Sequence, residues 1–315
     1  MNRTFCIVLA LACILVWVAP LPAQAPAAPF TVEESGETHD SLAEAVAAIG
    51  SGNGTILIAP GTYEQCAVQN EGRIAYVARE PGSVVFDGVA CEGKGALVLG
   101  GRSARVEGIV FQNIRVPDAN GAGIRLEAGD LLVRESMFRD GENGILVAND
   151  HRGTVRIEQS TFSGLGQCPE NGSCSHSIYN SGDAALVVTR SRFERGTGGH
   201  YLKSRGARIE VTDSSFDDSA GQATNYMIDL SVGATGTIAR NVFVQGANKE
   251  NYSAFIMVAP EGREHSSAGL SVTDNEAGLV PGLTRRTSFV ADESGEAITI
   301  ANNRLDPQIA RFERR

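Results

Sequence analysis

The segment Val155-Arg156-Ile157-Glu158-Gln159-Ser160-Thr161-Phe162 alternates apolar and polar strand formers, continues into a small polar pair and ends on a large apolar residue. Further copies of this phrase end 23 to 34 residues apart, at Phe111, Phe138, Phe193, Phe216 and Phe243, with weaker versions at Ala277 and Leu305. Short period-two strands that recur at such an interval are typical of a β-solenoid. The strands of a β-sandwich also recur, but a sandwich would not repeat one phrase in phase.

A second short strand recurs between these phrases, as in Gly144-Ile145-Leu146-Val147. The aliphatic residue at its second place forms one inward-facing stack, made of Ile124, Ile145, Ile178, Leu202, Ile228 and Ile256. Side chains alternate along a strand, so the third place faces outward. The repeats predict an all-β chain.

The chain has 315 residues and a net charge of −10, which excludes a general nucleic-acid binder because such a protein needs a basic surface. Residues 1–25 have the features of a signal peptide: Arg3, the apolar run Phe5–Val18 and the Ala23-Gln24-Ala25 cleavage motif. We therefore expect an exported protein, periplasmic or secreted, with no stable membrane insertion after cleavage. We also expect a monomer that acts on a polysaccharide.

Four cysteines remain after cleavage, and an even number in an exported protein indicates disulfides. Pairing sequence neighbours predicts Cys66–Cys91 and Cys168–Cys174. No Cys/His spacing indicates zinc.

The repeats and the entry segments Ser41–Val46 and Gly54–Tyr63 resemble right-handed parallel β-helix proteins of the pectate-lyase-like superfamily. The resemblance covers about residues 30 to 306. It implies a single-stranded right-handed parallel β-helix over 54–306, an N-terminal cap segment with a short helix over 26–53 and a C-terminal tail over 307–315. Ser41 and Glu44 would form the capping box of that helix. The superfamily contains lyases, hydrolases, epimerases and non-catalytic adhesins, so the fold does not fix the chemistry.

The run Gly199–Arg205 resembles a stretch of uncharacterised bacterial exported β-helix proteins. Adjacent strands of a ladder lie about 4.8 Å apart, so Tyr179, Lys203 and Asp229 should be neighbours in the outward column. Two positions before the aliphatic stack, His176, His200 and Tyr226 align; both histidines have the parity of the inward residues. The complete predicted site consists of catalytic His176, Tyr179, His200, Lys203, Arg205 and Asp229, and of substrate-binding Asn180, Tyr201 and Tyr226.

Each member also has a structural interpretation, since Lys203 beside Asp229 is an ordinary cross-strand pair. Taken together, the cluster favours a polysaccharide lyase that cleaves a uronic-acid polymer by β-elimination. Lys203 and Arg205 would supply a base and charge neutralisation, with the pKa of Lys203 lowered by the neighbouring cation. Tyr179 and His200 would act as acid or second base.

A glycoside hydrolase is the alternative enzyme, but it needs two carboxylates about 5 to 10 Å apart. The cluster contains only Asp229, and Asp150, Asp183, Glu194 and Glu261 fall in loops of unfixed position. A non-catalytic polysaccharide-binding or cell-surface β-helix is the third interpretation. No cofactor is expected, because Asp229 with Asn180 or Ser204 supplies too few oxygen ligands for calcium.

Overall fold

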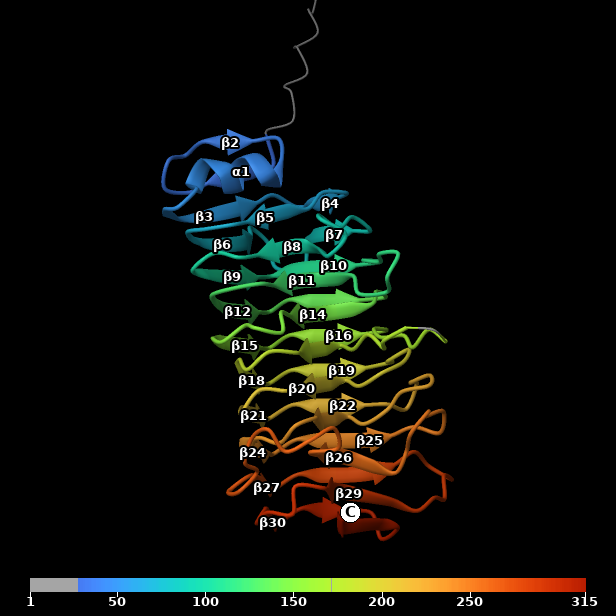
Figure 1. Cartoon of the computed structure of the whole chain (residues 1–315). Helices are drawn as coiled ribbons and strands as arrows, with labels where there is room; N and C mark the ends of the chain where they lie inside the picture. Colours follow the sequence, from blue (N-terminus) through green and yellow to red (C-terminus); the bar gives the residue numbers. More distant parts are fainter. Residues whose placement is uncertain (1–27, 171) are drawn as a thin grey trace, which may run out of the picture.

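The computed structural model describes residues 28–170 and 172–315, so the predicted signal peptide lies outside the described residues. The described chain winds into a parallel β-solenoid whose strands stack along one axis (Figure 1). Three sheets, here sheets A, B and C, run along this axis. Each turn of the solenoid contributes one strand to each sheet, in the order A, B, C.

Sheet A contains twelve strands: β2 (Thr38–His39), β1 (Phe30–Val32), β3 (Asn53–Ile58), β6 (Arg73–Ala78), β9 (Ser103–Glu107), β12 (Asp130–Arg134), β15 (Thr154–Glu158), β18 (Ala185–Thr189), β21 (Arg208–Thr212), β24 (Thr235–Ala239), β27 (Ser271–Thr273) and β30 (Thr299–Ala301). Sheet B contains ten: β4 (Gly61–Tyr63), β7 (Val84–Asp87), β10 (Ile109–Gln112), β13 (Met137–Arg139), β16 (Thr161–Ser163), β19 (Arg192–Glu194), β22 (Ser215–Asp217), β25 (Val242–Gln245), β28 (Glu276–Leu279) and β31 (Arg304–Leu305).

Sheet C also contains ten: β5 (Ala67–Gln69), β8 (Gly95–Leu99), β11 (Ala122–Leu126), β14 (Asn143–Val147), β17 (Ile178–Asn180), β20 (Leu202–Ser204), β23 (Ile228–Leu230), β26 (Ala254–Val258), β29 (Thr287–Asp292) and β32 (Ile309–Arg314). β1 pairs antiparallel with β2 and β3, whereas the pairs between later strands are parallel. The prediction of a C-terminal tail over 307–315 is therefore wrong, because β32 pairs with β29 and continues sheet C to Arg314.

The predicted phrase corresponds to one strand of sheet A, a tight turn and one strand of sheet B. At the turn after β15, Gln159 adopts a positive φ of 49°, and the Ser160 hydroxyl accepts from the backbone of the preceding turn of the solenoid at Ser136. Ser160 N–H in turn donates to Ser191 Oγ. The small polar residues thus satisfy backbone groups at a place where the ladder is interrupted.

The core is a set of side-chain stacks that follow the solenoid axis. The aromatic residues that end the phrase stack with ring centroids 4.6 to 5.8 Å apart, from Phe86 through Phe111, Phe138, Phe162, Phe193 and Phe216 to Phe243. The predicted aliphatic stack of sheet C is fully buried beside them. Such stacked aromatic pairs stabilise the fold beyond the contribution of the area that the rings bury.

At the N-terminal end, α1 (Leu42–Ile49) packs on the first strands of sheets A and C (Figure 1). Ser41 and Glu44 form the expected capping box. Both predicted disulfides are present, Cys66–Cys91 and Cys168–Cys174. Within the described residues, no helix has the length and hydrophobicity needed to cross a membrane.

Candidate functional site

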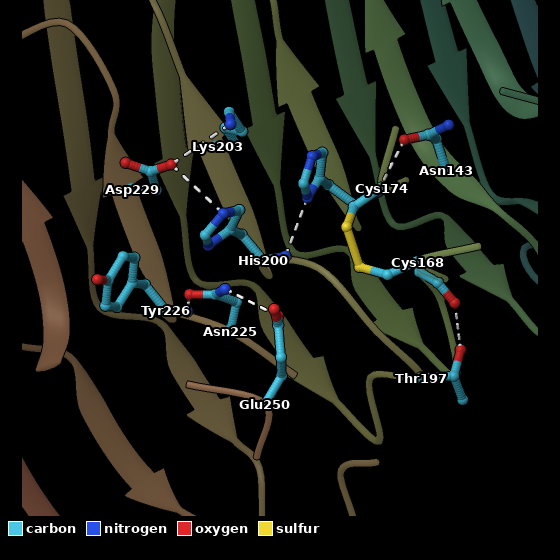
Figure 2. Close-up of a disulfide and its surroundings, with 12 residues drawn as sticks. Asn143, Cys168, Cys174, Thr197, His200, Lys203, Asn225, Tyr226, Asp229 and Glu250 are labelled. Atoms are coloured by element: carbon cyan, nitrogen blue, oxygen red, sulfur yellow. Dashed lines mark hydrogen bonds and ion pairs between the residues drawn. A yellow bond between two sulfur atoms is a disulfide. The ribbon is translucent and has the colours of Figure 1, made fainter. Parts of the chain in front are cut away.

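The outward column of sheet C has the predicted register. Tyr179 of β17 pairs with Lys203 of β20, and Lys203 pairs with Asp229 of β23. The side chains of Lys203, Asp229 and His200 converge outside this sheet (Figure 2). Three consecutive turns of the solenoid therefore build one polar cluster.

The two histidines stack as the alignment predicts, but they lie on the outer face and not inward. The ring centroids of His176 and His200 are 5.0 Å apart, and those of His200 and Tyr226 are 5.6 Å apart. His176 also meets the ring of Tyr179 edge-on at 5.0 Å. The strands begin only after these residues, at Ile178 and Leu202, so the alternation of a strand does not extend back to the histidines.

Hydrogen bonds from backbone N–H groups hold this stack of rings in place. His200 N–H donates to His176 Nδ1 at 2.9 Å, and His176 N–H donates to Asn143 Oδ1 at 2.8 Å. Burial lowers the pKa of His176 to about 3, with a further contribution from the charge of Lys203. Burial likewise holds the pKa of His200 well below its ordinary value. Both lowered pKa values favour the neutral imidazole at physiological pH, which argues against either histidine as a general acid.

Asp229 is the deepest charged group of the cluster, with a side chain only 2% exposed. Its Oδ2 accepts from Ser231 Oγ at 3.1 Å and lies 3.4 Å from His200 Nε2 and 3.7 Å from Lys203 Nζ. Burial raises the pKa of Asp229 to about 6, against the opposing attraction of Lys203. This carboxylate is ionised at pH 8 and largely protonated at pH 5.

Lys203 lies between two carboxylates, and its side chain is 12% exposed. Burial disfavours its charge, but Asp229 and Glu261 outweigh that effect and raise the pKa of Lys203. The expected lowering by a neighbouring cation is therefore wrong, because the carboxylates are closer partners than Arg205. A raised pKa favours the protonated ammonium of Lys203, which suits charge neutralisation better than proton removal.

Glu261 is the site residue that the sequence did not place. It lies in the loop after β26, where its N–H donates to Ser231 O at 2.8 Å. One carboxylate oxygen contacts Lys203 Nζ and the other contacts Arg205 Nη1. Burial opposes its ionisation, but the bonds from these two cations outweigh burial and lower the pKa of Glu261. Loop residues have no periodicity, so no signal in one sequence indicated this position.

The prediction that Tyr201 and Asn180 bind substrate is wrong, because both side chains point into the interior. Tyr201 is buried in the interior, where its hydroxyl donates to Asp218 Oδ1 at 2.7 Å. Asn180 is fully buried and donates to Ala184 O at 2.8 Å and Ser204 Oγ at 3.1 Å. The alternation of β17 turns Asn180 inward, and the backbone turn after His200 does the same for Tyr201.

The other predicted members line the outer rim of the cluster. Tyr226 is partly buried and packs against Ala254, Met257 and Ala291. Tyr179 is partly exposed, and Lys203 Nζ lies 5.5 Å from the centroid of its ring. Within residues 28–170 and 172–315, no group of three or more His, Cys, Asp and Glu side chains is arranged to hold a metal ion.

The Cys168–Cys174 disulfide closes a short loop that ends two residues before His176, and Figure 2 shows it near His200. Gln167 and Ser175 flank it as an antiparallel bridge, and His176 follows directly. The disulfide thus restrains the backbone that leads into the site.

Comparison with known proteins identifies the class. The family model described as "Right handed beta helix region" matches residues 122–305, and the chain belongs to this family. This match confirms the resemblance to right-handed parallel β-helix proteins.

Among solved structures, ORF18 of Geobacillus virus E2 is similar at 13% identity with a TM-score of 0.49, covering 89% of this chain and 60% of that one. A mutant of the PL6 family alginate lyase AlyGC is similar at 12% identity with a TM-score of 0.35, covering 86% of this chain and 52% of the lyase. The chain thus spans little more than half the length of these proteins. No curated protein matches the sequence.

Proposed function

We propose that the protein is an exported carbohydrate-active β-helix protein, a polysaccharide lyase that cleaves a uronic-acid polymer by β-elimination. The observation that carries this proposal is that Lys203 and Arg205 together hold one carboxylate group, that of Glu261, at the rim of the cluster. A uronate carboxylate has the same shape and charge. Arg and Lys donors aimed at one carboxylate are the arrangement that such a ligand requires.

In β-elimination a base takes the C5 proton, and the C5–H bonding pair forms the C4–C5 double bond. The C4–O bond breaks, its electron pair leaves on the glycosidic oxygen, and that oxygen takes up a proton. Negative charge develops on the uronate carboxylate during proton removal, and fixed cations lower that barrier. Lys203 and Arg205 supply those charges. Asp229 holds Lys203 from below, His200 contacts Asp229, and both Asp229 and His200 are buried.

Tyr179 is the group we assign to proton transfer. It is a partly exposed side chain with a phenol hydroxyl, and Lys203 Nζ lies 5.5 Å from the centroid of its ring. His176 meets the Tyr179 ring edge-on and fixes its orientation. His176 and Asp229 thus act as positioning residues, and Tyr226 forms a wall of the site.

A specific observation also favours the hydrolase as a second candidate. Glu261 adds the missing carboxylate, and the pKa of Asp229 is raised while that of Glu261 is lowered. Two carboxyl groups with pKa values pushed apart are the pattern of an acid and a base. Against it, Asp229 is 2% exposed and lies beneath Lys203, so a glycosidic oxygen would not meet it directly.

The test is to incubate the purified protein with a panel of polyuronates and follow the ultraviolet absorbance of the unsaturated product. The lyase predicts this absorbance and an equal number of new chain ends. New reducing ends without absorbance would support the hydrolase, and binding without either would support a non-catalytic polysaccharide-binding protein. Tyr179→Phe removes one hydroxyl and should lower turnover at least ~100-fold while substrate affinity is kept.

A further inference from the structure

The loop of residues 259–270, here the strap, connects β26 to β27 and is held against the site from several sides. Glu261 contacts Lys203 and Arg205, and Glu264 lies 3.8 Å from Arg205 Nη2. Further along, His265 Nε2 lies 3.5 Å from Asp183 Oδ1. The strap end is fixed by the Glu296 carboxylate, which accepts from Ser266 Oγ and from the amides of Ser267 and Ala268.

The backbone of the strap is anchored independently of the Glu261 side chain. Glu261 N–H donates to Ser231 O, and His265 N–H donates to Val232 O at 3.0 Å. The Glu261 side chain is 38% exposed. It can therefore rotate away from the cations into solvent while the strap itself stays bound.

The geometry points to Glu261 as a built-in competitor of the substrate. We infer that its carboxylate occupies the subsite for a uronate carboxylate on Lys203 and Arg205, and that a ligand binds by displacing it. This inference deepens the proposed function and rests on it for the class of ligand. The strap would therefore set a minimum affinity for ligands, because a ligand has to displace the Glu261 carboxylate from Lys203 and Arg205 before it can bind.

The competition has a measurable size. If the subsite is free in only a fraction of molecules, the apparent dissociation constant is the intrinsic one divided by that fraction. A single partly exposed carboxylate on two cations would leave roughly one subsite in ten free, so removing its charge should tighten binding roughly tenfold. A polymer with several uronates offsets this cost through its other subsites, whereas a monosaccharide does not.

The experiment compares Glu261→Gln with wild type by calorimetric titration with trisaccharides of galacturonate, guluronate, mannuronate and glucuronate, and with neutral galactotriose. Glu264→Gln is the matched control, because it removes the same charge from the same strap at a side chain that is 66% exposed. We expect at least one uronate to bind roughly tenfold tighter to Glu261→Gln, little change in Glu264→Gln, and no gain for galactotriose. Thermal unfolding checks that each variant folds, and Glu261→Ala repeats the comparison.

A Glu261→Gln protein that binds every uronate as weakly as wild type, or more weakly, overturns the inference, as does a gain shared by galactotriose. This failure is separate from that of the proposed function, which is judged by product formation in wild type. If the protein forms no product but Glu261→Gln binds a uronate more tightly, the inference about Glu261 holds and the proposed lyase function fails. If the wild type forms product but Glu261→Gln binds no uronate more tightly, the lyase function holds and the inference about Glu261 fails.

Discussion

The buried carboxylate of Asp229 should make the protein less stable as the pH rises, and Asp229→Asn should remove this dependence. The pKa of Asp229 is about 6 in the folded protein against an ordinary value of 3.8, mainly because burial disfavours its charge. A group whose pKa is raised by folding contributes stability that is fully present below its unfolded pKa. That contribution is lost as the pH rises through the folded value, here between about pH 4 and pH 7.

The magnitude follows from the two pKa values. The difference between about 6 and 3.8 corresponds to about 3 kcal/mol of unfolding free energy. At pH 4 Asn and protonated Asp are similar in shape and charge, so the two proteins should differ by a small constant amount. At pH 8 the Asn variant should have gained about 3 kcal/mol relative to wild type.

Urea unfolding of both proteins at intervals from pH 4 to pH 8 measures this difference directly. Glu261→Gln is the control of opposite sign: two cations lower the pKa of Glu261, so its contribution is present at high pH and is lost as the pH falls through its folded pKa. A difference between Asp229→Asn and wild type that does not change with pH would refute the reasoning. If Asp229→Asn instead becomes less stable relative to wild type as the pH rises, His200 and Lys203 stabilise the Asp229 charge more than burial penalises it.

Four further outcomes are expected. Lys203→Ala should lower lyase turnover at least ~100-fold in steady-state kinetics because it removes a charge that stabilises the transition state, while Arg125→Ala, in the same outward column, should stay within about twofold; equal losses would indicate a general basic face. Lys203→Ala should also cost on the order of 2 kcal/mol at pH 8 and less at pH 5, because it leaves the Asp229 carboxylate unpaired, and a stability loss that is the same at both pH values would argue otherwise. Replacing Cys168 and Cys174 by Ser should speed amide hydrogen exchange around His176 and lower global stability by at most ~2 kcal/mol, so unchanged exchange would count against a restraining role. Phe193→Ala, in the middle of the aromatic stack, should cost ~3–5 kcal/mol in urea unfolding, and a loss below ~1 kcal/mol would contradict the stack's place in the core.

The fold and the register were predictable because they follow from local periodicity. In a ladder of parallel strands, one aligned aliphatic such as Ile178 fixes which residues of neighbouring turns touch, and so Tyr179, Lys203 and Asp229 were placed correctly. Glu261 and the orientation of Tyr201 depend on loops and turns, whose conformation comes from tertiary contacts. The pKa of Lys203 was mispredicted for the same reason, since its partner in the strap was unknown.

The position of Asp229 is not required by the fold. The same outward column contains Val98, Leu146, Met257 and Ala291, and all four are at most 4% exposed. An apolar side chain therefore fits this column on both sides of the cluster without the desolvation cost that Asp229 incurs. Replacing a buried ion pair by apolar residues of similar volume is often neutral or stabilising. We expect the buried charge of Asp229 to weaken the solenoid at high pH, and the role we propose for it is to hold a charged lysine ammonium beneath the proposed subsite that Glu261 occupies.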